Sequence, residues 1–123
     1  YALGYPQRAR TPFGRIDWTG LSRLDFEPPD TATFRCLGLA YQAGRLGGGA
    51  PAALSAANEV AVEAFLAGRI AWTSIPDVPE GVLSRHDGGV PDTVDAVIEI
   101  DREARARARE VVDGLPSPAG SAS

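Results

Sequence analysis

An alanine-rich segment without glycine or proline, Ala52–Leu66, constrains the fold of this chain most strongly. Pro51 precedes the segment and Gly68 follows it. Proline fits the first turn of a helix, and glycine is common just after the last one. The pattern therefore predicts a helix from Ala50 to Ala67, about 27 Å long at 1.5 Å per residue.

One side of this predicted helix carries an apolar stripe. Small alanines in the stripe would let a second helix approach closely, and we expect the Phe65 ring to lie in the core. Asn58 is four residues from apolar positions on either side, so we also expect it to face inward. A buried amide without partners costs roughly 1–3 kcal/mol. We therefore interpret Asn58, with the adjacent Glu59, as a structural candidate that ties the helix to its surroundings. The stripe comprises Leu54, Ala57, Ala61, Val62 and Phe65.

Three further helices are expected, one before this helix and two after it. The first starts at a cap among Asp30, Thr31 and Thr33, and it ends at Gly44 or in the run 47–49. The second starts at Thr73 or Ser74 and runs through Leu83, although Pro79 and Gly81 weaken it. The third starts at Thr93, with a second cap at Asp101. The predicted fold class is all-α, a bundle of about four helices.

Residues 6–30 predict an irregular connector arm ahead of the bundle. Four prolines, with Gly14 and Gly20, prevent a long helix in this stretch. Trp18, Leu21 and Phe26 are nevertheless large and apolar, and the alternation in 24–26 is typical of a short edge strand. We expect this arm to pack against its own bundle or against another domain.

Composition excludes several functions for the chain itself. It has 16 acidic and 12 basic residues, a net charge of −4 that argues against nucleic-acid binding. Its cations are all arginine, so chemistry that needs a lysine is absent from these 123 residues. One cysteine and one histidine cannot form a structural zinc site. No apolar run is long enough for a membrane span, and we expect a cytoplasmic location.

Four local features resemble chemical sites, but each has a simpler interpretation. The run 47–52, GGGAPA, formally fits the dinucleotide pattern G-x-G-x-x-A, but a helix precedes it where the motif needs a strand. The arginines in 102–109 alternate with acidic residues, as on a solvated helix face. His86 stands in a glycine-rich loop and is expected to be exposed, whereas Cys36 is expected to be a small buried hydrophobe. These residues by themselves display no active site.

The segment 54–66, LSAANEVAVEAFL, closely resembles a helix of the 1-deoxy-D-xylulose 5-phosphate reductoisomerase family, approximately LNAANExAVxAFL. Ser55 replaces the usual asparagine. The opening YALGYPQR, the pair Asp17-Trp18, the segment 24–30 and the stretches 93–97 and 101–105 also resemble that family in order and spacing. The likeness covers residues 1 to about 112.

This resemblance implies a parent enzyme that converts 1-deoxy-D-xylulose 5-phosphate to 2-C-methyl-D-erythritol 4-phosphate with NADPH and a Mg or Mn ion, usually as a homodimer. The family's catalytic, NADPH-binding and metal-binding residues lie upstream, so none is carried over to this chain. It implies that residues 1–30 are the end of the catalytic domain and the connector, and that 31–113 are the C-terminal helical bundle. We expect 114–123 to be a disordered tail.

Two hypotheses follow for the role of the chain. The first is a C-terminal structural domain of the reductoisomerase that has no activity alone and whose partner is the upstream catalytic domain. The second is a free-standing helical module for protein interaction. The absence of methionine and an opening, Tyr1–Pro6, that is typical of the end of a helix favour the first. In either case the candidate residues are structural or interdomain: Trp18, Leu21, Phe26, Asn58, Glu59 and Phe65.

Overall fold

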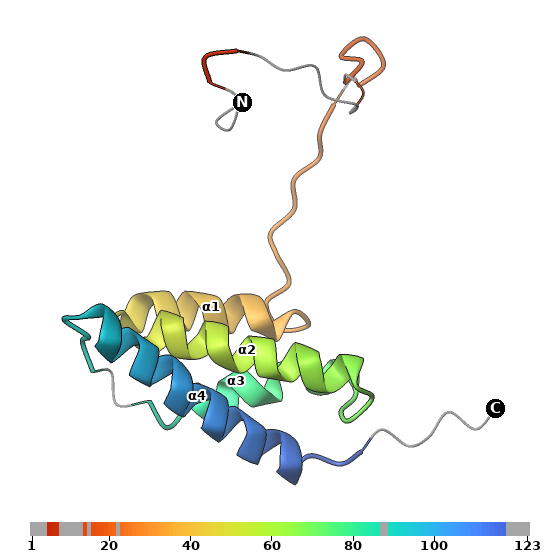
Figure 1. Cartoon of the computed structure of the whole chain (residues 1–123). Coiled ribbons are helices and arrows are strands. Elements are labelled where there is room, and N and C mark those ends of the chain that lie inside the picture. Colours follow the sequence, from red (N-terminus) through yellow and green to blue (C-terminus); the bar gives the residue numbers. More distant parts are fainter. Residues whose placement is uncertain (1–4, 8–13, 15, 22, 87–88, 118–123) are drawn as a thin grey trace.

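The computed structural model describes residues 5–7, 14, 16–21, 23–86 and 89–117, and these form a helical bundle with an extended arm (Figure 1). No strand occurs among the described residues, which confirms the all-α fold class. The predicted edge strand at 24–26 is wrong, because these residues form no strand and no other described segment lies beside them to pair with. The helices are α1 (Arg35–Leu46), α2 (Ala50–Leu66), the 3-10 helix η2 (Trp72–Ser74), α3 (Asp77–Leu83) and α4 (Val94–Gly114).

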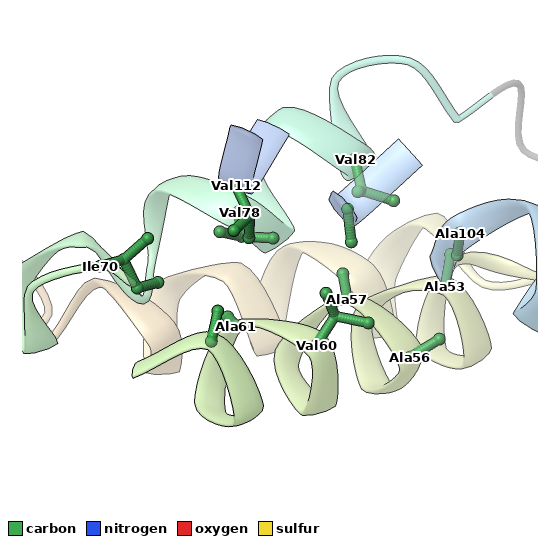
Figure 2. Close-up of a cluster of buried hydrophobic side chains, with 12 residues drawn as sticks. Ala53, Ala56, Ala57, Val60, Ala61, Ile70, Val78, Val82, Ala104 and Val112 are labelled. Carbon is green, nitrogen blue, oxygen red and sulfur yellow. The ribbon is translucent and has the colours of Figure 1, made fainter. Parts of the chain in front are cut away.

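The core lies where α2 packs against α4 and α3 (Figure 2). Alanines dominate the α2 side of this core, and α4 contributes Ala104 and Ala108. Because these side chains end at Cβ, the two helices approach more closely than helices with large contact residues can. Among the largest fully buried side chains are Ile70, Val78 and Val82, which come from the connection after α2 and from α3.

The ends of α2 and α4 follow the local sequence signals. Pro51 occupies the first turn of α2, and Gly68 follows its end with φ +71°, a conformation that other residues rarely adopt. At the start of α4, the Thr93 side chain accepts a hydrogen bond from the Ala96 backbone N–H at 3.1 Å. The second cap predicted at Asp101 does not form, because α4 continues through that residue.

The starts of α1 and α3 differ from the prediction, whereas their ends, before the glycine run 47–49 and at Leu83, agree with it. Helix α1 begins at Arg35 without a side-chain cap and passes through Gly44 to end before Gly47. Asp30 instead accepts hydrogen bonds from backbone N–H groups in the turn just ahead of the helix. The stretch predicted as one helix from Thr73 to Leu83 is divided into η2 and α3.

Two glycines permit close contacts between elements. A Cβ on Gly49 would lie 2.5 Å from the Ile100 side chain of α4, so nothing larger than glycine fits without a shift. A Cβ on Gly81 of α3 would lie 3.1 Å from the Val111 side chain, also on α4. Gly81 lowers the intrinsic helix propensity of α3, but its lack of a side chain allows α3 to pack closely against α4.

The buried face of α2 is rotated from the predicted one. Ala53 and Ala64 are buried where Leu54 and Phe65 were expected, and Asn58 is exposed. The predictions of an inward Phe65 and an inward Asn58 are therefore wrong. The physical reason is that α4 presents alanines to α2, so the closest packing uses the alanine face of α2 and leaves larger side chains at its edge.

The first two residues of the predicted tail, 114–123, are ordered. Gly114 is the last residue of α4, and Leu115 packs against the core. Residues 118–123 of that prediction lie outside the described residues, as do the first four residues of the predicted helix end at Tyr1–Pro6.

A test of the alanine packing compares two identical substitutions on α4. Ala108 is fully buried and Ala106 is exposed. We expect Ala108→Leu to lower the free energy of unfolding by about 1–3 kcal/mol, because overpacking forces the helices apart. Ala106→Leu should change it by less than about 0.5 kcal/mol. Chemical denaturation followed by circular dichroism measures both, and equal losses would contradict the proposed packing.

Candidate functional site

The described aromatic side chains lie on the surface of the molecule rather than in its core. Every aromatic residue that the structure describes is exposed. Aromatic rings bury large areas where proteins and domains meet, so this distribution is typical of a domain with docking surfaces. The rings are those of Tyr5, Trp18, Phe26, Phe34, Tyr41, Phe65 and Trp72.

The connector arm carries three of the predicted site residues. Trp18 is 71% exposed, Leu21 38% and Phe26 87%. The arm, drawn in orange in Figure 1, leads from the N-terminal end of α1 away from the bundle. Of the two expected packing partners, the chain's own bundle therefore does not cover these side chains.

Two short turns give the arm local order. The Asp17 carboxylate accepts hydrogen bonds from the Thr19 hydroxyl at 2.6 Å and from the Thr19 backbone N–H at 2.9 Å. These bonds lower the pKa of Asp17, the hydroxyl bond most strongly, because they favour the charged form. The Asp30 pKa is lowered in the same way, chiefly by a side-chain hydrogen bond from Thr33.

Glu59 joins α2 to α4 through an ion pair. Its carboxylate accepts a hydrogen bond from Arg105 Nη2 at 2.6 Å, and the same guanidinium donates through Nε to Asp101 at 2.7 Å. Asp101 and then Glu59 raise the pKa of Arg105 above its usual value. The tie to a neighbouring element that the sequence suggested for Asn58 is thus made by Glu59.

Three of the four arginines in 102–109 are paired with carboxylates. Arg102 pairs with Glu99 at 2.9 Å and Arg107 with Glu103 at 3.2 Å, in addition to the Arg105 pairs. Neutralised guanidiniums on an exposed helix surface do not form a phosphate site, which agrees with the prediction of a solvated face. The glycine run at 47–49 likewise connects two helices, α1 and α2, as expected.

The environments of His86 and Cys36 differ from those predicted. His86 is half-buried beside a hollow of about 430 Å³, and its Nε2 has no hydrogen-bond partner among the described residues. Cys36 has an exposed thiol at the start of α1. Both predictions came from neighbours in sequence, whereas the surroundings are set by residues far along the chain.

An apolar hollow of about 440 Å³ lies where the arm joins the bundle. Phe34, Cys36, Trp72, Ile75 and Pro76 line it, together with Thr33, Arg35 and Thr73. No sequence motif pointed to Trp72, which follows α2 in a short connection without helical periodicity. A bulky aromatic in such a connection is the signal that could have identified it.

The described residues contain no group of three or more histidine, cysteine, aspartate or glutamate side chains that could hold a metal ion. None of the described helices combines the length and apolar character that crossing a membrane requires.

Comparison with known proteins places this architecture in a family. The family model described as "DXP reductoisomerase C-terminal domain" matches residues 1–107. The chain belongs to this family. The resemblance carried by the segment 54–66 and the connector is thereby confirmed.

Curated and solved relatives of the DXP reductoisomerase family give a consistent result. The chain is 46% identical over 115 residues to a 1-deoxy-D-xylulose 5-phosphate reductoisomerase from Chloroherpeton thalassium, covering 94% of the chain and 30% of that protein. The reductoisomerase from Zymomonas mobilis, solved with NADPH, shares 38% identity at a TM-score of 0.79, covering 92% of the chain and 30% of that protein. A DXP reductoisomerase solved with NADPH, fosmidomycin and magnesium shares 35% identity at a TM-score of 0.75, with coverages of 91% and 30%. The chain thus spans about 30% of the length of these relatives.

A first prediction concerns Phe65, whose side chain is 37% exposed. Phe65→Ala should cost less than about 2 kcal/mol of unfolding free energy, because only part of the ring's apolar area leaves water on folding. Ile70→Ala, at a position 1% exposed, should cost about 2–5 kcal/mol. Urea denaturation of both variants measures the two losses of unfolding free energy. A larger loss for Phe65→Ala than for Ile70→Ala would contradict the exposed position of the ring.

A second prediction concerns the pair between Glu59 and Arg105. Both side chains have solvent contact, so a double-mutant cycle with Glu59→Gln and Arg105→Gln should give a coupling of about 0.2–1 kcal/mol. The coupling should decrease as salt is added, because the charges are screened. A coupling near zero at low salt would show that the two side chains do not interact in solution.

Proposed function

We propose that this chain is the C-terminal domain through which a 1-deoxy-D-xylulose 5-phosphate reductoisomerase supports its catalytic domain. The observation that carries the proposal is the family match over residues 1–107, which includes the connector as well as the bundle. The proposed whole protein isomerises 1-deoxy-D-xylulose 5-phosphate and reduces the product with NADPH to 2-C-methyl-D-erythritol 4-phosphate. It would thus combine isomerase and oxidoreductase activity in the non-mevalonate route to isoprenoids.

We propose that the cofactors of that reaction bind outside this chain. The 123 residues include no lysine, and the described ones hold no cluster of metal-ligating side chains. We therefore assign the NADPH site and the Mg or Mn site to the part of the proposed enzyme that precedes this chain. Two solved relatives are complexes with NADPH, and one of them also contains magnesium.

The proposed task of the chain itself is mechanical. Trp18, Leu21 and Phe26 would pack on the preceding catalytic domain, because each bulky apolar side chain contributes about 1.5–3 kcal/mol when fully buried. The bundle would then anchor the end of the connector. Relatives that are about three times longer support this role over that of a free-standing interaction module. We also propose a cytoplasmic homodimer without nucleic-acid or membrane partners.

The test joins this chain to the preceding part of the Chloroherpeton thalassium reductoisomerase in place of that enzyme's own C-terminal region. We expect the chimera to oxidise NADPH in the presence of 1-deoxy-D-xylulose 5-phosphate. The same polypeptide ending before Arg35 should lose at least about 100-fold in activity, because small misplacements of a site have effects of that size. The isolated 123-residue chain should neither bind nor oxidise NADPH.

A matched pair of variants tests the arm within the chimera. Phe26→Ser should reduce activity or thermal stability, because a buried contact is lost, whereas Tyr41→Ser, an exposed aromatic on α1, should change neither. Undiminished activity of the polypeptide that ends before Arg35 would refute the supporting role of the bundle. Substrate-dependent NADPH oxidation by the isolated chain would refute the assignment of the cofactor sites.

A further inference from the structure

The apolar hollow at the start of α1 has the form of a docking groove, which we call the root groove. One wall is formed by Phe34 and Cys36 and the other by Trp72, Ile75 and Pro76. Phe34 is 61% exposed and Trp72 64%, so both rings border the hollow with much of their surface in water. Its volume of about 440 Å³ lies within the range of small-molecule and side-chain pockets.

The charge balance of the root groove favours an apolar occupant. Arg35 is the charged residue in its lining, and its guanidinium donates to Asp77 at 2.8 Å and also to Glu80. These acidic partners raise the pKa of Arg35, with the Asp77 hydrogen bond as the largest cause. Because this positive charge is already compensated, an anionic ligand gains little there, whereas large apolar side chains would remove the two exposed rings from water.

The chain enters the bundle at the edge of this groove in a defined direction. Asp30 Oδ1 accepts hydrogen bonds from the backbone N–H groups of Ala32 at 3.1 Å and Thr33 at 3.0 Å. The Phe34 N–H donates to the Asp30 carbonyl at 2.9 Å. Pro28 and Pro29, just ahead of this turn, restrict the backbone further. The turn therefore joins the arm firmly to the wall of the groove.

The position of the missing polypeptide decides which occupant fits. The relatives are about three times longer than this chain, and the family model is that of a C-terminal domain, so their remaining sequence precedes it. Through the arm, such a segment would belong to the same polypeptide as the root groove. A tether within one polypeptide raises the effective concentration of a segment and so favours it over an untethered partner.

We propose that the root groove binds an apolar segment of the catalytic part that precedes this chain in the same polypeptide. The inference rests on the proposed function and adds a second point of attachment to it. The arm would fix one contact through Trp18 and Phe26, and the groove would fix another at the bundle itself. Two contacts on either side of a stiff turn would set the orientation of the bundle, which the arm alone would leave free.

Cys36 provides the measurement, because its thiol is exposed, lines the groove and is the only cysteine of the chain. Alkylation by iodoacetamide is followed at the Cys36 peptide by mass spectrometry, in the isolated chain and in the chimera described above. We expect fast alkylation in the isolated chain and alkylation at least about tenfold slower in the chimera, since a covered site reacts only when it opens.

Two aromatic variants of the chimera separate groove docking from general changes in folding. Trp72→Ala should restore fast alkylation of Cys36, because it removes one wall of the groove. Tyr41→Ala, on α1 but outside the groove, should leave Cys36 protected. Circular dichroism of the isolated chain with each substitution checks that the bundle still folds. If Trp72→Ala unfolds it, Trp72→Leu serves in its place.

Each outcome decides the proposal. Equal alkylation rates in the isolated chain and in an active chimera would overturn groove docking while leaving the proposed function intact. Slow alkylation of the isolated chain at every concentration would mean that its own arm fills the groove. Alkylation of the isolated chain that becomes slow only at high protein concentration would mean that a second copy of the chain fills the groove. Either result would overturn the proposal. Protection of Cys36 in an inactive chimera would support docking and count against the proposed function alone.

Discussion

The close packing of α2 against α4 is the interaction on which the rest of this structure depends. It is made mainly by alanines, among them Ala57 and Ala108, which are fully buried. Alanine loses no side-chain entropy in a helix and keeps the distance between helix axes short. It also adds little apolar area per residue, so the bundle gains stability from close fit more than from bulk.

The small size of the side chains in the core affects which residues lie on the surface. The buried residues of the main cluster are alanines, valines and a single isoleucine, and the described aromatic residues all remain outside it. Trp18 and Phe26 lie on the connector, and Phe34 and Trp72 border the root groove, where the connector enters the bundle. A bundle of this kind is suited to a supporting role, because its own packing is complete while its docking groups remain available.

Much of the fold was predictable from local signals. Pro51 and Gly68 gave the limits of α2 to within a residue, and Thr93 gave the start of α4. Caps and breakers work over a few residues, so they are visible in sequence. The start of α1 was less predictable, because Asp30 caps a turn in place of the helix and nothing local distinguishes the two. Family membership was predictable for a different reason, since the motif 54–66 is long and specific.

The candidate site was predicted only in part. The apolar connector was evident from Trp18, Leu21 and Phe26, because such residues among prolines have no place in a solvated linker. The root groove was not evident, since its two walls lie about forty residues apart along the chain. The predicted inward position of Asn58 was wrong because helical periodicity alone does not say which of two adjacent faces of α2 is buried. Packing against the neighbouring helix decides which face it is.

The sequence by itself determined the helices, the stiff connector and the family, because these depend on backbone preferences and on motifs that are contiguous in the chain. The tertiary structure alone decided which face of α2 is buried, that Glu59 pairs with Arg105, and that Phe34 and Trp72 border one groove. Those outcomes depend on which surfaces of distant segments fit together most closely. Shape complementarity between two helices is a property of both, and it cannot be read from the sequence of either one.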